Sequence, residues 1–136
     1  MQSNRTFASV AVAAGLLSVC LLITPAYAAD PDCKAGKLQG RYVFNGQGTN
    51  LHYGIFDFDG SGNFQGKQTS FRQTNTAQRE TLRGTYTINA DCTGAMVMDG
   101  QPGGTAHWDI FVTSDGKKGR MIRTDAGTRG VRTFEQ

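Results

Sequence analysis

The feature that most constrains this sequence is a two-residue alternation of apolar and polar side chains, repeated between glycine-rich turns. In segment 82–89 every second residue is apolar or glycine, and the residues between them are polar. Segment 105–113 repeats the pattern, with Trp108 and Ile110 on one face and His107 and Asp109 on the other. Successive side chains of a β-strand point to opposite faces, so this alternation predicts half-buried strands.

Extended along the chain, the pattern predicts eight short strands and almost no helix. The run Asp59-Gly60-Ser61-Gly62-Asn63 is typical of a tight hairpin turn, because glycine and asparagine tolerate a positive φ. We expect a polar loop over 73–81 and at most one helical turn near 31–37. The expected strands are 40–45, 52–59, 64–72, 82–89, 95–99, 105–113, 119–124 and 130–134.

Eight short strands joined by short links favour an all-β, antiparallel up-and-down meander. Closing such a meander into an eight-stranded barrel removes its exposed edges. We expect Gly54, Gly66 and Gly84, which lie inside strands, to mark bends that curve a small barrel. A two-sheet β-sandwich is the alternative.

Residues 1–28 have the features of a secretory signal peptide. Arg5 precedes an apolar stretch over 7–23, and Ala26-Tyr27-Ala28 places small residues at the two positions that signal peptidase recognises. Cleavage after Ala28 leaves residues 29–136 as a single β-barrel domain. The sequence therefore predicts export to the periplasm or the extracellular space.

The rest of the composition argues against several classes of protein. Beyond residue 28 no apolar run approaches the ~20 residues of a membrane helix, so we do not expect an integral membrane protein. The formal net charge is only +3 and is spread along the chain, which disfavours nucleic-acid binding through a dense basic patch. No motif indicates a cofactor.

The cysteines predict one disulfide. Cys20 lies within the leader; a lipoprotein signal that retains it is the alternative, but Val19 stands where lipoprotein processing prefers a small residue. Cys33 and Cys92 remain as an even pair in an oxidising compartment, which predicts a structural disulfide. No Cys-x-x-Cys spacing indicates a reactive pair.

The sequence contains Leu-Gln-Gly-Arg-Tyr-Val-Phe at 38–44, Phe-Asp-Gly-Ser-Gly-Asn-Phe at 58–64 and Gly-Thr-Tyr-Thr-Ile-Asn-Ala-Asp-Cys-Thr-Gly at 84–94. These three segments resemble a family of small exported bacterial proteins with the allene oxide cyclase barrel-like domain. The resemblance covers nearly all of 38–134 and implies a calycin-like eight-stranded barrel. Family members of known activity are cyclases, which close an epoxy fatty acid to a cyclopentenone or perform intramolecular cycloadditions. The matching motifs are turns and strand ends, so the resemblance assigns no catalytic residue here.

Two groups of residues are candidates for chemistry. His107 and Asp109 share one strand face, and His52 and Asp57 are available from another strand; a histidine near a carboxylate could act as a general base. The structural alternative places the face opposite Trp108 outside the barrel, in solvent. The catalytic candidates are His107, Asp109, Asp57 and Arg123.

The segment from Asp57 to Gln68 overlaps the start of a calcium loop, with oxygen ligands available at Asp57, Asp59 and Ser61. Position twelve of such a loop is Gln68, which cannot supply the bidentate carboxylate, and no helices flank the segment. A hairpin turn explains the same residues, so no metal site is expected.

The aromatic residues are numerous enough to fill a core and to leave a few at a barrel mouth, where a small hydrophobic ligand could enter. Segment 52–59 offers apolar side chains to both faces, so we expect a loop or a second subunit to cover one of them. The ligand-contact candidates are Tyr53, Phe56, Tyr86, Trp108 and Phe111.

The last third of the chain has a basic bias. It could attract an acidic ligand or an anionic surface. We favour a solvated rim whose charges keep strand edges from pairing. The residues concerned are Lys117, Lys118, Arg120, Arg123, Arg129 and Arg132.

Three functions are compatible with these observations. The leading hypothesis is an exported, non-enzymatic barrel that binds a small apolar or amphipathic molecule. The second is an isomerase or cyclase that uses the barrel interior as a shaped pocket. The third is a structural or protein-interaction module with a filled interior.

Overall fold

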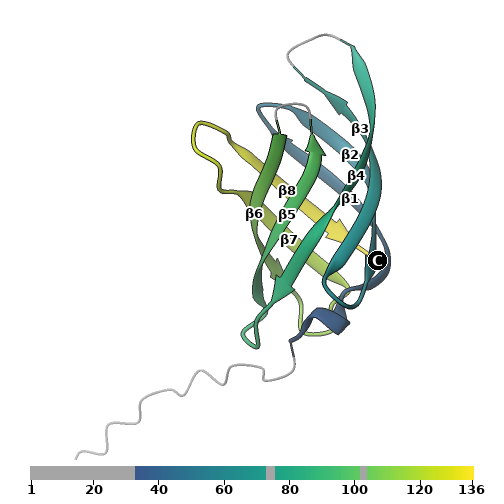
Figure 1. Ribbon diagram of the computed structural model, residues 1–136, viewed down its shortest axis with the longest axis vertical. Helices are drawn as coiled ribbons and strands as arrows, with labels where there is room; N and C mark the ends of the chain where they lie inside the picture. Colours follow the sequence, from purple (N-terminus) through teal and green to yellow (C-terminus); the bar gives the residue numbers. More distant parts are fainter. Residues whose placement is uncertain (1–32, 73–75, 102–103) are drawn as a thin grey trace, which may run out of the picture.

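The computed structural model describes residues 33–72, 76–101 and 104–136 and forms a closed eight-stranded antiparallel barrel (Figure 1). Each strand pairs with its neighbours in sequence, and β8 returns to pair with β1. The predicted up-and-down barrel is confirmed. The strands are β1 (Gln39–Gly48), β2 (Leu51–Asp59), β3 (Asn63–Phe71), β4 (Ala77–Ile88), β5 (Thr93–Gln101), β6 (Gly104–Val112), β7 (Lys118–Arg123) and β8 (Gly130–Glu135).

The strands run further than the hydrophobic pattern indicates, most clearly at β4. Residues 77–81, expected in a polar loop, form the first part of this strand and pair with β3, Ala77 opposite Phe71 and Glu80 opposite Gln68. The prediction of a loop over 73–81 is wrong for these residues. Apart from Ala77 they have polar or charged side chains, because the inside of the barrel is polar where β4 begins.

The core is built from side chains that alternate inwards along every strand. The burial pattern of β6 is strictly alternating, with Trp108 and Ile110 inside and His107 and Asp109 outside, as the sequence predicts. Phe56 is stacked on Phe44, with ring centroids 4.1 Å apart, and meets Phe64 edge-on at 5.5 Å. Packed aromatic rings therefore fill the half of the barrel in which β1 begins.

One end of the barrel, which we call the base, is closed by the segment that precedes β1. This segment includes the short 3-10 helix η1 (Ala35–Lys37), which lies at the lower end of the barrel in Figure 1. Leu38 is fully buried, and the Tyr86 hydroxyl donates to the carbonyls of Ala35 and Leu38 at 3.1 Å and 2.9 Å. The expected helical turn is thus present and acts as a plug.

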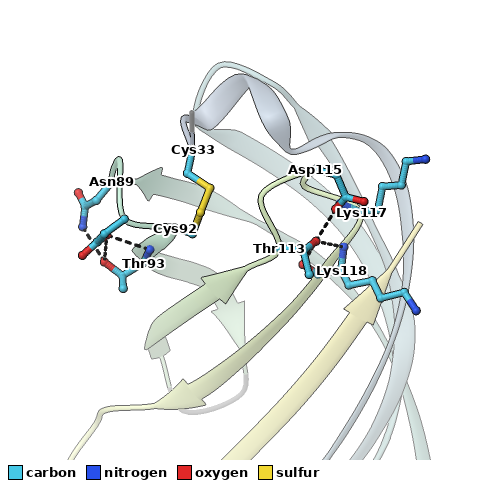
Figure 2. Close-up of a disulfide and its surroundings, with 9 residues drawn as sticks. Cys33, Asn89, Cys92, Thr93, Thr113, Asp115, Lys117 and Lys118 are labelled. Carbon is cyan, nitrogen blue, oxygen red and sulfur yellow. Dashed lines mark hydrogen bonds between the residues drawn. A yellow bond between two sulfur atoms is a disulfide. The ribbon is translucent and has the colours of Figure 1, made fainter. Parts of the chain in front are cut away.

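The predicted disulfide between Cys33 and Cys92 is confirmed, and it ties this plug to the β4–β5 turn (Figure 2). The two Cα atoms are 5.0 Å apart, and the residues are separated by 59 positions. Cys33 is buried against the core cluster. A covalent bond and the tyrosine hydrogen bonds together hold the base shut.

The three hairpin turns at the base share one device, an aspartate that accepts a hydrogen bond from the backbone N–H two residues later. Asp59 accepts from Ser61 at 2.7 Å, and Asp91 accepts from Thr93 at 3.1 Å. Asp115 does the same with Lys117 at 3.0 Å, in the second turn that Figure 2 shows. Such side-chain bonds favour turns over continued strand.

The glycines inside strands are required by close approach. A Cβ atom at Gly84 would lie 1.9 Å from the carbonyl oxygen of Val97, and one at Gly54 would lie 2.2 Å from that of Lys67. Neither distance is possible for a real side chain. These positions therefore let neighbouring strands approach and aromatic rings pack inside a narrow barrel.

The predicted signal peptide, residues 1–28, lies outside the described residues. Within the part of the chain that the structure describes, no helix is both long and apolar enough to cross a membrane. The disulfide fits a protein of an oxidising compartment.

Candidate binding site at the mouth of the barrel

Towards the end opposite the base, which we call the mouth, the inward side chains change from apolar to polar. On β8, Arg132 lies two residues nearer the mouth than Phe134, and both side chains are buried. On β3 the inward positions run from Phe64 to Gln68 and Ser70. Because residues two apart in a strand share a face, these polar side chains continue the core inside the barrel.

Arg132 is the most deeply buried charged residue that the structure describes, with 3% of its surface exposed. Its guanidinium lies between two rings, with Cζ 5.0 Å from the centroid of Phe44 and 4.7 Å from that of Trp108. Nη1 donates to the sulfur of Met98 at 3.6 Å. Among the described residues, Nε has no hydrogen-bond partner and Arg132 forms no ion pair.

This position corrects the expectation that Arg132 belongs to a solvated rim. The arginine fits inside because its partner across the β1–β8 pairing is Gly46. A Cβ atom at Gly46 would lie 2.6 Å from Cγ of Arg132. Burial lowers the pKa of Arg132 to about 9, and repulsion from Arg123 acts in the same direction.

Glu80 organises the opposite wall of the mouth. Its Oε1 accepts from Nη2 of Arg72 at 2.8 Å, and its Oε2 accepts from the Ser70 hydroxyl at 3.2 Å and from the Gln68 amide. Burial alone raises the pKa of Glu80, but the bonds from Gln68, Arg72 and Ser70 outweigh it and lower the pKa. Glu80 is therefore a carboxylate held by three donors.

Arg123, a catalytic candidate, lines the mouth from the end of β7. Its Nε donates to Oδ2 of Asp125 at 2.7 Å, and its Cζ lies 5.9 Å from the ring centroid of Trp108. Asp125 also accepts the backbone N–H of His107 at 2.9 Å and contacts its ring Nδ1 at 2.7 Å. The bonds from His107 and Arg123 hold the pKa of Asp125 well below its usual value.

A partly enclosed cavity of about 20 Å³ lies among these groups, and its lining includes His52, Arg72, Trp108, Arg123 and Arg132. A void of this size holds about one water-sized group. Like Nε of Arg132, Nδ1 of His52 and Nε1 of Trp108 are buried without a hydrogen-bond partner among the described residues. The mouth is thus a small polar cavity above an apolar floor.

His52 should make the stability of the barrel depend on pH. Burial, together with repulsion from Arg132 and Arg72, lowers its pKa to about 4 from a usual 6.5. As pH falls from ~6.5 to ~4, His52 binds a proton in the unfolded chain before it does so in the folded chain. Its contribution to the stability of the barrel is therefore constant above pH ~6.5 and decreases as the pH falls to ~4. The full difference between the two pKa values corresponds to ~3 kcal/mol in the free energy of unfolding. We expect a loss of about 2 kcal/mol, because the His52 side chain is partly exposed.

Urea denaturation at a series of pH values measures this decrease. His52→Gln should flatten the profile between pH ~6.5 and ~4.5. His107→Gln, which removes the other histidine of the sequence from the exposed outer face, should retain the decrease. A His52→Gln profile that matches the unsubstituted protein would contradict the assignment.

The structure does not bring the four catalytic candidates into one site. His107 and Asp109 are exposed on the outer face of β6. Asp57 lies on the outer face of β2, where both carboxylate oxygens accept from Arg41, at 2.8 Å and 3.1 Å. Arg123 alone of the four lines the mouth.

The five ligand-contact candidates occupy three different environments. Phe56 and Tyr86 are buried in the core towards the base. Tyr53 and Phe111, 66% and 50% exposed, lie on the outer surface. Trp108 lines the mouth cavity. The expectation that a loop or a second subunit covers the outer apolar side chains stays a prediction.

The residues considered for calcium form a turn. Asp59 Oδ1 accepts from the backbone N–H groups of Ser61 and Asn63, and Asp57 is paired with Arg41. Among the described residues, no group of three or more histidine, cysteine, aspartate or glutamate side chains is placed to hold a metal ion.

No model of a known protein family matches the chain, and no curated protein matches it significantly. Membership of the allene oxide cyclase barrel-like family therefore stays a prediction that rests on the quoted motifs.

Proposed function

We propose that this chain is an exported binding protein for a small amphipathic molecule whose polar end enters the mouth of the barrel. One observation carries the proposal: Arg132, Trp108 and His52 line one cavity, and each has a buried side-chain nitrogen (Nε, Nε1 and Nδ1) without a partner among the described residues. Buried polar groups are normally hydrogen-bonded, so groups without a protein partner gather where a ligand or ordered water completes them.

The packing below the mouth limits how such a molecule is held. Phe44 and Phe56 stack directly beneath Arg132, and the rings around them fill the interior towards the base. A cavity of about 20 Å³ admits the polar end of a ligand and leaves its apolar part at or beyond the rim. This arrangement supports binding more than a cyclase, which needs a pocket that encloses the reacting chain.

Native mass spectrometry of protein purified from its own cell envelope tests the proposal. We expect a co-purified molecule of defined mass that is released on denaturation. Trp108 is the single tryptophan of the sequence and lines the cavity, so adding the released molecule back should change its fluorescence emission.

A matched pair of variants locates the binding. Ala106 is buried and lines the cavity, and Ala106→Leu should fill it and reduce the co-purified fraction about tenfold or more. Ala95→Leu makes the same change on the exposed face of β5 and should retain the molecule. A protein that carries no molecule, and whose Trp108 emission is insensitive to extracts of the envelope, would refute the proposal.

A further inference from the structure

The charged groups of the mouth do not balance. Its described residues include four arginines and two carboxylates, and one of the arginines, Arg129, is exposed to solvent. Arg72 pairs with Glu80 at 2.8 Å, and Arg123 pairs with Asp125 at 2.7 Å. Arg132 is left with no carboxylate partner among the described residues, although it is the most buried of the four arginines. The mouth therefore has one buried positive charge that is uncompensated.

The surroundings of Arg132 compensate this charge only in part. Taking an ion out of water is costly unless it is paired and hydrogen-bonded. The Phe44 and Trp108 rings attract the guanidinium, but they provide no hydrogen-bond acceptor for its N–H groups. His52, whose pKa is about 4, is neutral at pH 7 and adds no second positive charge.

The geometry restricts which anion can approach. The Phe44 and Trp108 rings lie against the guanidinium, with centroids 5.0 Å and 4.7 Å from Cζ, so they limit the directions from which an anion can approach, and Nη1 is already directed to Met98. The edge that includes Nε is the one that a planar carboxylate can engage with two parallel hydrogen bonds. The indole N–H of Trp108, without a partner among the described residues, offers a further donor to the same cavity.

We infer that the polar end of the ligand is a carboxylate that enters the mouth first and pairs with Arg132, an inference that rests on the proposed function. One negative charge neutralises the one buried positive charge, and one carboxylate oxygen has about the size of the group that the cavity of about 20 Å³ holds. A phosphate monoester carries a charge of about −1.5 to −2 and three terminal oxygens, so it needs more space and more buried positive charge than this cavity provides.

A series of six-carbon probes with different polar ends tests the inference on the unsubstituted protein. Hexanoate, hexanamide, hexylammonium and hexyl phosphate are titrated at pH 7 while Trp108 emission is followed, with calorimetry as a second measurement. We expect hexanoate to bind about 10- to 100-fold more tightly than hexanamide, because an ion pair replaces a hydrogen bond to a neutral acceptor. Hexylammonium and hexyl phosphate should bind more weakly than hexanoate.

Arg132→Met removes the charge and keeps a long apolar side chain between the two rings. It should lower hexanoate affinity by the same 10- to 100-fold and lower hexanamide affinity by less, because the amide loses a hydrogen bond but no ion pair. Arg83→Met makes the same substitution on the exposed face of β4 and should leave hexanoate affinity within about twofold. Thermal unfolding checks that both variants are folded, and the probe series decides the question if Arg132→Met is not.

The outcomes separate this inference from the proposed function. If hexanamide or hexylammonium binds as tightly as hexanoate, the mouth binds ligands but the carboxylate assignment is wrong. Tighter binding of hexyl phosphate would equally overturn the assignment. If no probe binds and no molecule co-purifies, the proposed function fails and the inference fails with it.

Discussion

Replacing Phe56 by alanine is expected to destabilise the barrel by about 4 kcal/mol, a large part of the stability of a domain of this size. Phe56 is fully buried and lies at the centre of the aromatic packing, stacked on Phe44 at 4.1 Å with Phe64 and Phe134 edge-on to it. Truncation removes the transfer free energy of the ring, leaves a cavity that a closed barrel cannot collapse to fill, and loses several ring–ring contacts.

The measurement is the midpoint and slope of urea denaturation. Phe111→Ala is the matched control, because Phe111 is half exposed on the outer face of β6 and its truncation should cost less than ~0.5 kcal/mol. The slope should be the same for both variants, since neither changes the surface exposed on unfolding appreciably. A loss below ~1 kcal/mol for Phe56→Ala would show that the aromatic packing does not stabilise the barrel as described.

Removing the disulfide by the double substitution Cys33→Ala and Cys92→Ala should cost about 4 kcal/mol. The bond closes a loop over a sequence separation of 59 residues, so its loss restores considerable conformational freedom to the unfolded chain. It also frees the plug formed by η1 from the β4–β5 turn. We expect the base to open before the rest of the barrel when the bond is absent.

Reductant provides the control for this variant. The unsubstituted protein treated with a reductant under denaturing conditions should show the same denaturation midpoint as the double variant. The double variant itself should not respond to the reductant. Hydrogen exchange of the Leu38 amide, which donates to the carbonyl of Ala35 at 3.1 Å, should become faster in the variant. Unchanged exchange would mean that the tyrosine hydrogen bonds hold the base closed without the disulfide.

Much of the fold could be predicted from the sequence because its main determinants are local. The alternation in 105–113 places Trp108 and Ile110 inside, where the structure has them. The turn at 59–63 is set by Asp59 and its adjacent glycines, which act within five residues of one another. Barrel closure followed from the count and spacing of strands, and the two cysteines left only one pairing.

The hydrophobic pattern does not predict the polar mouth, because the side chains that point inwards there are polar or charged. The sequence pattern predicts a solvated rim for Arg132 and a loop for Glu80. The signal was present in the parity of the strands: Arg132 lies two residues from buried Phe134, and Arg123 lies two residues from buried Met121. Continuing the inside–outside alternation past the last apolar residue of each strand would have placed both arginines inside.

The contacts between the residues of the mouth could not be predicted from the alternation of side chains along single strands. Trp108 on β6 meets Arg132 on β8 across the interior, with β7 between them in the sheet. Such a contact depends on the diameter of the closed barrel and on which strands face each other. The space for the arginine also depends on Gly46, which the β1–β8 register brings opposite it.

The pairing of β1 with β8 has a consequence for the order of folding. All other pairings join consecutive strands, so hairpins can form one after another without bringing distant parts of the chain together. Only β1 and β8 pair residues about 90 positions apart, such as Val43 and Glu135, and closing a loop of that length costs about 4 kcal/mol in chain entropy. We expect this seam to close last. In the oxidised chain the Cys33–Cys92 disulfide bridges about half of the residues between Val43 and Glu135. The bond that closes the base therefore also shortens the loop that must close when β1 pairs with β8.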